Sequence, residues 1–316
     1  MKKLISVLCL LAMFAAALLP AQAQAEQIRV GALTGPTAMG MAELLGNDAC
    51  APSIFGSADE LTPLILKGEV DLAAVPANLA ATLYNKTEGG VTTLAVNVLG
   101  VLYICAYQMP EIASLEDLRG QILYATGKGA TPEYFLRYVL TRNGLDPDRD
   151  LTIEWKSEPG EVVALLNARQ SGVAMLPQPY VTAAAAQLGE GFRSALSVSQ
   201  EWERLEDGTR CTTAVVIGRT EYIRQHPAEV EAFLEQLSAS VAWVNENPAQ
   251  AAALCQELGI AKAAVAEKAI PQCNLVCITG GDMKQALSGC LGVIFDQNPK
   301  AVGGAMPGDD FYYGGE

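Results

Sequence analysis

Two short polar turns have the residue types and spacing to bind a ligand. The first spans residues 34–37 (Thr-Gly-Pro-Thr) and separates an apolar run at 28–33 from a helical pattern. The second spans residues 126–131 (Thr-Gly-Lys-Gly-Ala-Thr) and also joins a predicted strand to a predicted helix. A helix N-terminus carries unpaired amides and a partial positive charge, which favours a polar or anionic ligand. Each turn alone would suit an ordinary helix cap, but the recurrence of the pattern favours binding.

The elements that must hold these turns alternate between strand and helix. Apolar runs predict strands at residues 28–33, 71–76, 92–102, 121–125, 151–155 and 173–177. Helical patterns lie between them, at residues 58–66, 131–143, 160–170 and 180–188. This alternation indicates βαβ units and an α/β fold whose sheets are mostly parallel.

In sheets of this kind, ligands bind outside the carboxyl ends of the strands. Small or polar residues at those ends, and at the starts of the helices that come next, are therefore the candidate ligand-binding residues. They are Thr34, Gly35, Thr37, Ser57, Pro76, Asn78, Gly100, Thr126, Gly129, Thr131, Pro177 and Gln178.

The chain also divides into two parts of similar pattern. A buried strand that ends in proline occurs at Pro76 and again at Pro177, which indicates two related α/β lobes. An apolar strand at 211–218 is expected to carry the chain back to the first lobe, and the residues after this strand are mostly helical in pattern. We therefore predict a first lobe made of residues 26–120 and 212–316, and a second lobe made of 121–211.

The first 25 residues have the features of a secretory signal peptide. Lys2 and Lys3 precede an apolar run at 4–19, and small residues up to Ala25 form an A-x-A cleavage pattern. The apolar run is shorter than the ~20 residues of a membrane-spanning helix. No Cys follows the predicted cut, so no lipid anchor is expected. The sequence predicts a periplasmic or extracellular protein.

The charge of the chain argues against a nucleic-acid partner. The formal net charge is −14, and the loss of Lys2 and Lys3 with the leader would make the mature chain more negative still. Binding to nucleic acid needs a basic face, and no Lys/Arg cluster occurs.

Cysteines are frequent in the last quarter of the chain. Export permits disulfides, so one or two are predicted among Cys255, Cys273, Cys277 and Cys290. The 273–277 pair could also suggest a metal site, but the single His226 is distant in sequence and no second Cys pair has zinc-ribbon spacing. We predict no metal and no cofactor.

The residues needed for catalysis are not grouped in the sequence. Nucleophilic catalysis needs a base beside the nucleophile, and His226 lies at a helix start away from both turns. The glycines around residues 31–35 and 127–129 match neither a phosphate-binding loop nor a dinucleotide fingerprint. The sequence therefore predicts a binding protein without catalytic residues.

Several segments resemble one family of binding proteins. From residue 28 onward the chain is similar to periplasmic solute-binding proteins of ABC importers, in the NMT1/THI5-like group that includes sulfonate/taurine, nitrate and pyrimidine-precursor binders. The segments that carry the resemblance are 33–40 (LTGPTAMG), 75–85 (VPANLAATLYN), 99–103 (LGVLY), 124–134 (YATGKGATPEY), 175–179 (MLPQP) and 311–313 (FYY).

The resemblance implies a type II periplasmic binding fold. Two lobes joined by a two-strand hinge would close over a small polar or anionic molecule, which a membrane permease then imports. Thr37 and Thr131 would face each other across the cleft, and the protein would act as a monomer. No Arg lies at a predicted strand end to clamp a sulfonate through two hydrogen bonds, which argues against a sulfonate ligand.

Three alternatives share these features. A TRAP-type receptor would use a similar fold, and a ligand sensor for a membrane receptor would look the same in sequence. The group also contains a pyrimidine-precursor synthase that consumes its own His. The position of His226 and the signal peptide argue against that enzyme.

Overall fold

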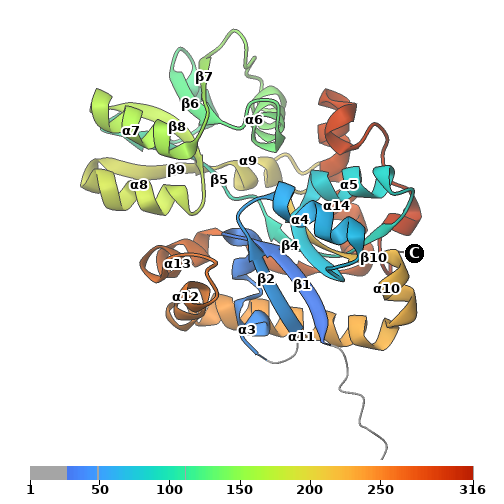
Figure 1. Cartoon of the computed structure of the whole chain (residues 1–316). Coiled ribbons are helices and arrows are strands. Elements are labelled where there is room, and N and C mark those ends of the chain that lie inside the picture. The colour runs from blue at the N-terminus through green and yellow to red at the C-terminus, as the bar shows by residue number, and fades with distance from the viewer. Residues whose placement is uncertain (1–26, 48–49, 111, 316) are drawn as a thin grey trace, which may run out of the picture.

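Two β-sheets, each covered by helices, make up the protein. The computed structural model describes residues 27–47, 50–110 and 112–315, so the predicted signal peptide at 1–25 lies outside the described residues. Figure 1 shows the sheets in separate lobes, with the second lobe above the first. Among the residues described, no helix combines the length and the apolar character needed to cross a membrane.

The first sheet has a parallel part and a reversed part. Its order is β11 (Leu275–Ile278), β4 (Val91–Leu99), β10 (Thr212–Arg219), β3 (Leu72–Pro76), β1 (Ile28–Leu33) and β2 (Cys50–Phe55). Strands β1, β2 and β3 run parallel, while β10 lies antiparallel between β3 and β4. The chain returns from the second lobe along β10, so this strand runs in the direction opposite to β3 and β4.

The second sheet repeats this plan with one fewer strand. Its order is β7 (Thr152–Lys156), β6 (Ile122–Thr126), β8 (Gly172–Pro177), β5 (Leu102–Tyr107) and β9 (Phe192–Ser197). Strands β6, β7 and β8 are parallel, and β5 is antiparallel to both neighbours. The predicted lobe boundary at residue 120 is wrong for β5, because that strand pairs in the second sheet. An apolar run does not reveal which sheet it will join.

Helices cover both faces of each sheet. The first lobe carries α2 (Pro36–Met39), α3 (Ala42–Leu45), α4 (Ala58–Lys67), α5 (Ala77–Lys86), α10 (Thr220–Gln225), α11 (Pro227–Glu246), α12 (Pro248–Glu257), α13 (Ala263–Ala269) and α14 (Gly280–Gln297). The second lobe carries α6 (Thr131–Arg142), α7 (Pro159–Arg169), α8 (Tyr180–Leu188) and α9 (Val198–Glu203). Short 3-10 helices are η1 (Leu115–Leu118), η2 (Gly189–Gly191), η3 (Ile270–Gln272), η4 (Pro299–Val302) and η5 (Asp309–Phe311).

One apolar core passes from the first lobe into the second. It includes Leu61 of α4 and Leu287 of α14 in the first lobe, and Leu136 of α6 and Trp202 of α9 in the second. A separate core lies on the other face of the first sheet, where α11 and α12 pack. Burial of a large apolar side chain stabilises the fold by about 1.5–3 kcal/mol. The shared core therefore holds the two lobes together as well as each lobe by itself.

The cysteines differ from the sequence-based prediction. All seven cysteines of the described residues are free thiols, so the predicted disulfides among Cys255, Cys273, Cys277 and Cys290 are wrong. These thiols fill positions in the cores instead: the Cys273 Sγ lies 3.9 Å from the Met39 sulfur, and the Thr212 amide donates to the Cys290 Sγ over 3.4 Å. A buried thiol packs as a small apolar side chain. Burial raises the pKa of Cys290 to about 12.

A buried carboxylate anchors the end of the first sheet that lies away from the helix-starting turns. Asp71, 4% exposed, accepts hydrogen bonds from the Arg29 guanidinium at 2.5 and 2.8 Å and from Arg219 at 2.8 Å. Burial raises the pKa of Asp71, but the hydrogen bonds from the two Arg side chains outweigh it, so the net shift is downward. The ionised form is the one that the fold stabilises.

Replacing this carboxylate tests its role in stability. We expect Asp71→Asn to lower the free energy of unfolding by about 2 kcal/mol, below the 3–5 kcal/mol of a fully buried pair because Arg29 is 38% exposed. A lowered folded-state pKa gives stability above the unfolded pKa that is lost as the pH falls through the folded value. Urea unfolding should therefore show a difference between variant and wild type that is constant above about pH 5 and shrinks below about pH 4.

Asp59→Asn is the control for this prediction, because Asp59 is exposed in the first turn of α4. Equal losses in Asp71→Asn and Asp59→Asn would show that the pairing with Arg29 and Arg219 contributes nothing.

Candidate functional site

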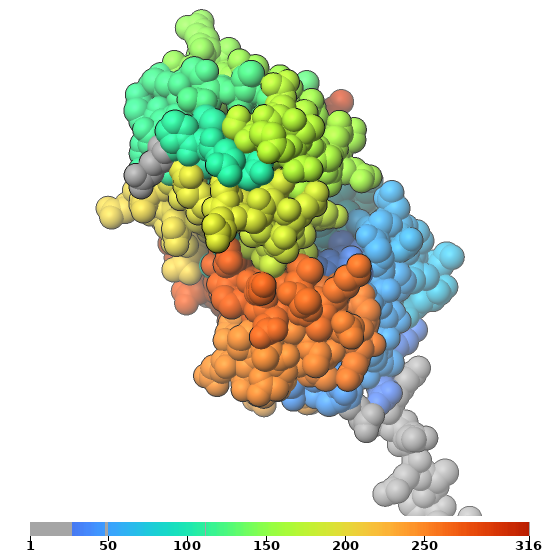
Figure 2. Space-filling model, turned by 90° about the vertical axis from the view of Figure 1, so that its left-hand side faces the viewer, coloured from blue at the N-terminus to red at the C-terminus, as the bar shows by residue number. Residues whose placement is uncertain are grey.

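The turns singled out in the sequence lie at the carboxyl ends of parallel strands in both sheets. The two turns follow β1 of the first lobe and β6 of the second, and the neighbouring parallel strands β3 and β8 end at the predicted residues Pro76 and Pro177. In Figure 1, the ends of β1 and β2 point toward the second lobe. Figure 2 shows the surface hollowed between the first-lobe atoms in blue and the second-lobe atoms in yellow-green.

The first turn is more fully bonded within the protein than the sequence predicted. The Thr34 amide donates to the Phe55 carbonyl at 3.0 Å, and the Gly35 amide donates to the Ile260 carbonyl at 3.1 Å. Gly35 has φ +84°, which a residue with a side chain adopts only with strain. The helix that comes next, α2, has only four residues. A row of free amides is therefore not available here, and the exposed Thr34 and half-buried Thr37 hydroxyls remain as ligand-binding groups.

Asn97 of β4 fixes the position of this turn. Its side-chain nitrogen donates to the Thr37 carbonyl over 2.8 Å, and the residue is 1% exposed. The Asn97 Oδ1 is one of two buried side-chain oxygen or nitrogen atoms without a hydrogen-bond partner in the described part of the chain. Sequence reasoning missed this residue. The available signal was a single amide side chain within the apolar run of β4.

The second-lobe turn is fixed at both the amide and the carbonyl of Gly129. The amide donates to the Glu133 carboxylate at 2.6 Å, and the carbonyl accepts from the Tyr134 hydroxyl at 2.9 Å. Arg137 in turn holds Glu133 at 2.9 Å. Thr131, half-buried, is the first residue of α6. Its hydroxyl therefore lies beside a turn whose shape is set in advance.

The remaining residues of this turn differ in their exposure. Thr126, the last residue of β6, is 7% exposed, whereas Lys128 is exposed. The ammonium group of Lys128 forms no ion pair with any described residue. It is a positive charge that an anionic ligand could approach.

Two of the predicted residues at the end of β3 face different surroundings. Pro76, half-buried, ends the strand, whereas the Asn78 side chain donates to the Ala301 carbonyl at 3.3 Å. Asn78 is thus bonded to the segment that follows α14. Ser57, at the N-cap of α4, is exposed and makes no side-chain capping bond.

Gln178 contacts the other lobe. It is 2% exposed, its Nε2 donates to the Gln272 Oε1 at 3.0 Å, and its own Oε1 accepts from the Thr182 hydroxyl at 2.9 Å. The Tyr103 hydroxyl donates to the Gln272 carbonyl at 2.7 Å. Gln178 and Tyr103 belong to the second sheet region, whereas Gln272 follows α13. Sequence reasoning missed Tyr103 and Gln272, which pair only in three dimensions.

Pro177, the residue before Gln178, ends β8 and pairs with Leu102 of β5. The chain enters the second sheet at Leu102, directly after the first crossing, which is the segment at residues 100–101 between β4 and β5. Pro177 is therefore close to this crossing between the lobes.

Gly100 lies at the crossing itself. A Cβ added at Gly100 would come within 2.7 Å of the Ser199 Cβ and 2.8 Å of the Cys211 sulfur. Cys211 lies just before β10, where the chain crosses back to the first lobe, and Ser199 lies in α9 of the second lobe, so the first crossing packs against both. The Asn274 side chain also donates to the Gly100 carbonyl. Gly100 thus acts in the packing of the hinge.

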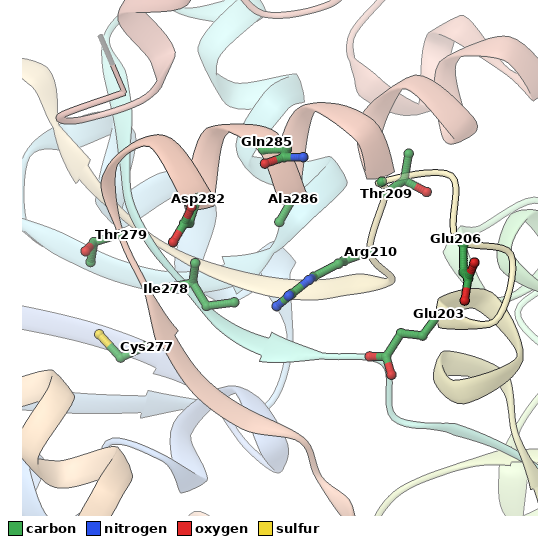
Figure 3. Close-up of a pocket in the computed structure, with 11 residues that line it drawn as sticks. Glu203, Glu206, Thr209, Arg210, Cys277, Ile278, Thr279, Asp282, Gln285 and Ala286 are labelled. Atoms are coloured by element: carbon green, nitrogen blue, oxygen red, sulfur yellow. The ribbon is translucent and has the colours of Figure 1, made fainter.

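A second hollow, here called the hinge-side groove, lies between α14 and the second crossing, which is the segment at residues 204–211 that leads from α9 to β10. It has a volume of about 880 Å³, and Figure 3 shows Arg210 extending into it from the crossing segment. Three carboxylates, those of Glu203, Glu206 and Asp282, make its lining predominantly acidic. None of the twelve predicted ligand-binding residues lines this hinge-side groove. The other lining residues are Gly208, Thr209, Cys277, Ile278, Thr279, Gln285 and Ala286.

His226 lies outside both regions. It stands between α10 and α11, with its ring stacked on Tyr222 at 4.5 Å. The turns and the hinge-side groove therefore contain no imidazole.

Comparison with known families places the chain in one of them. Residues 37–259 match the model of the NMT1-like family. The chain belongs to the NMT1-like family. The resemblance predicted from the sequence is thus confirmed at the level of the family. Among curated proteins, none matches the chain in sequence.

Solved structures extend the comparison to the whole fold of this NMT1-like protein. It is similar to an ABC transporter protein from Parabacteroides distasonis, with TM-score 0.77, 25% identity, and coverage of 91% of this chain and 98% of that chain. The periplasmic aliphatic sulphonate binding protein SsuA from Escherichia coli gives TM-score 0.68 at 18% identity, covering 88% and 90% of the two chains.

The alkanesulfonate-binding protein SsuA from Xanthomonas axonopodis pv. citri, bound to MOPS, gives TM-score 0.59 at 15% identity, covering 90% and 96%. The two SsuA structures establish the fold. The predicted two-lobed type II periplasmic binding fold is confirmed.

The close packing at the hinge gives a testable expectation for stability. Gly100→Ala places a Cβ against Ser199 and Cys211, which must shift to accommodate it. Overpacking of this kind costs about 1–3 kcal/mol. Thermal or urea unfolding should show a loss of that size.

Gly292→Ala is the matched control, because Gly292 lies inside α14 and an added Cβ meets nothing within 4 Å. Alanine is the better helix former by about 0.5–1 kcal/mol, so this variant should be slightly more stable than wild type. A Gly100→Ala protein as stable as Gly292→Ala would contradict the packing argument.

Proposed function

We propose that this NMT1-like protein is the extracytoplasmic solute-binding component of an ABC importer. It captures a small polar or anionic molecule between its lobes and delivers it to a membrane permease. The observation that carries the proposal is the pairing of polar turns, at 34–37 and 126–131, at the carboxyl ends of strands in two separate lobes. The proposal includes a leader cleaved after about residue 25 and a monomeric mature protein.

The exposed groups of the turns favour a ligand rich in hydrogen-bond acceptors. The first lobe offers the hydroxyls of Thr34 and Thr37, and the second offers that of Thr131 with the ammonium group of Lys128. These turns carry donors and one positive charge, and no carboxylate is exposed at residues 34–37 or 126–131. A carboxylate, phosphate or other oxygen-rich compound suits this set.

The similar proteins bind ligands of related chemistry. The Escherichia coli SsuA binds aliphatic sulphonates, and the Xanthomonas SsuA is bound to MOPS. In this chain no Arg lies in either turn to clamp a sulfonate through two hydrogen bonds. We therefore do not assign a sulfonate ligand to this chain.

Retention of a ligand by the secreted protein is the direct test. We expect native mass spectrometry of protein purified from its host to detect a bound small molecule, removable by unfolding and refolding. Returning that molecule at 100 times its Kd should stabilise the protein by about 2.7 kcal/mol, seen as a higher Tm. A compound that emerges chemically altered, instead of intact, would mean that the protein is an enzyme.

Variants of the two turns locate the site. Thr37→Ala and Thr131→Ala should each weaken binding of the recovered molecule about tenfold to a hundredfold, the equivalent of a lost hydrogen bond worth about 1–3 kcal/mol. Isothermal titration calorimetry measures the change. The matched control is Thr152→Ala, since Thr152 is exposed at the opposite end of the second sheet. Wild-type affinity in both turn variants would place the site elsewhere, with the hinge-side groove as the next region to test.

A further inference from the structure

A chain of hydrogen bonds connects the first lobe to the ligand-facing turn of the second. Tyr134, in the first turns of α6, is 6% exposed and stands at its centre. Its hydroxyl donates to the Gly129 carbonyl at 2.9 Å and accepts from the Asn298 Nδ2 at 2.8 Å. Asn298 follows α14, on the first-lobe side of the contact. The carbonyl of a turn in one lobe is thus bonded to a side chain of the other lobe through one hydroxyl.

The orientation of the Asn298 amide is determined by its second contact. Its Oδ1 accepts from the Lys300 amide at 3.2 Å as the N-cap of η4. The nitrogen of the same amide must then face Tyr134. A side-chain amide nitrogen has no acceptor capacity, so it can only donate to the Tyr134 oxygen. The hydroxyl proton of Tyr134 is therefore directed away from Asn298 and onto the Gly129 carbonyl.

A further hydrogen bond links α14 to α6. The Gln297 Nε2 donates to the Tyr134 carbonyl at 3.0 Å. The segment after α14 also reaches the first-lobe strand ends, since the Ala301 carbonyl accepts from Asn78. Residues 297–301 thus contact Tyr134 beside the second-lobe turn and Asn78, a predicted ligand-binding residue of the first lobe.

We propose that Asn298 is a positioning residue for the ligand-binding turn of the second lobe. By donating to Tyr134, it directs the tyrosine proton to the Gly129 carbonyl and so fixes the shape of residues 127–131. Separation of the lobes would remove Asn298 and free the hydroxyl to rotate, so the turn, still bonded to Glu133, is held more firmly when the lobes are together. The link to ligand capture rests on the proposed function, whereas the bond chain itself is testable without a ligand.

The test compares two replacements of Asn298 by hydrogen exchange of the ligand-free protein. Asn298→Asp keeps the acceptor that caps η4 but turns the donor into a carboxylate, which takes the Tyr134 proton away from Gly129. Asn298→Ala loses the cap yet leaves Tyr134 free to donate to Gly129. We expect the Gly129 and Ala130 amides to exchange about fivefold faster than wild type in the Asp variant. In the Ala variant the rise should be smaller, because the Tyr134 hydroxyl can still donate to Gly129 but is no longer directed there. A purely structural role in capping η4 predicts the reverse order.

Two further variants complete the experiment. Asn85→Asp is the matched control, because the Asn85 nitrogen donates to the Val302 and Ala305 carbonyls within the first lobe only. It should leave the Gly129 and Ala130 amides unchanged. Tyr134→Phe removes the central hydroxyl, so it should raise exchange as Asn298→Asp does, and the double variant should show no additional effect.

Additive effects of Tyr134→Phe and Asn298→Asp, or equal exchange in Asn298→Asp and Asn85→Asp, would overturn the proposal. Neither result depends on a ligand. The proposed function would fail separately, through the absence of any retained or stabilising small molecule.

Discussion

The contact between the two crossings of the chain is the constraint on which the arrangement of lobes depends. The first crossing passes through Gly100, and the second passes through Cys211. Cys211 and Ser199 of α9 lie against Gly100 with no room for a Cβ. The sheets therefore meet along a short, tightly packed seam. Because β5 and β10 both begin at this seam, each enters its sheet antiparallel to its neighbours. The remaining parallel strands then direct their carboxyl ends toward the space between the lobes.

Besides the shared apolar core, a few polar side chains join the lobes away from the seam. Gln272 bonds to Gln178 and Tyr103, and Asn298 bonds to Tyr134. Each neutral hydrogen bond contributes only about 0.5–1.5 kcal/mol to stability. A ligand that bonds to both lobes could supply a comparable free energy. Ligand binding could therefore stabilise the contact between the lobes about as much as these hydrogen bonds do. A hinge built in this way suits a protein that must both capture and release.

The proposed ligand site combines rigid turns with exposed donors. Asn97 holds Thr37 from the first sheet, while Glu133 and Tyr134 hold Gly129 from α6. A turn that is shaped before the ligand arrives loses less conformational entropy on binding. The hinge-side groove has a different character, with three carboxylates around Arg210. The turns therefore suit an oxygen-rich ligand better than the groove does.

The sequence alone determined the strands β1, β3, β4, β6, β7, β8 and β10, the helices between them and the polar turns at their ends, because these depend on local patterns of apolar residues, Gly and Pro. It did not predict the edge strands β2, β9 and β11, nor β5, which comes directly after the apolar run predicted at 92–102. Strand β1 and helix α8 have the predicted ends. Only the tertiary structure decided that β5 joins the second sheet, that the cysteines pack as free thiols, and that Gln178 and Asn78 bond within the protein. Partners such as Gln178–Gln272 and Tyr134–Asn298 are far apart in the chain, and no local pattern encodes a contact that forms only when separate elements pack together.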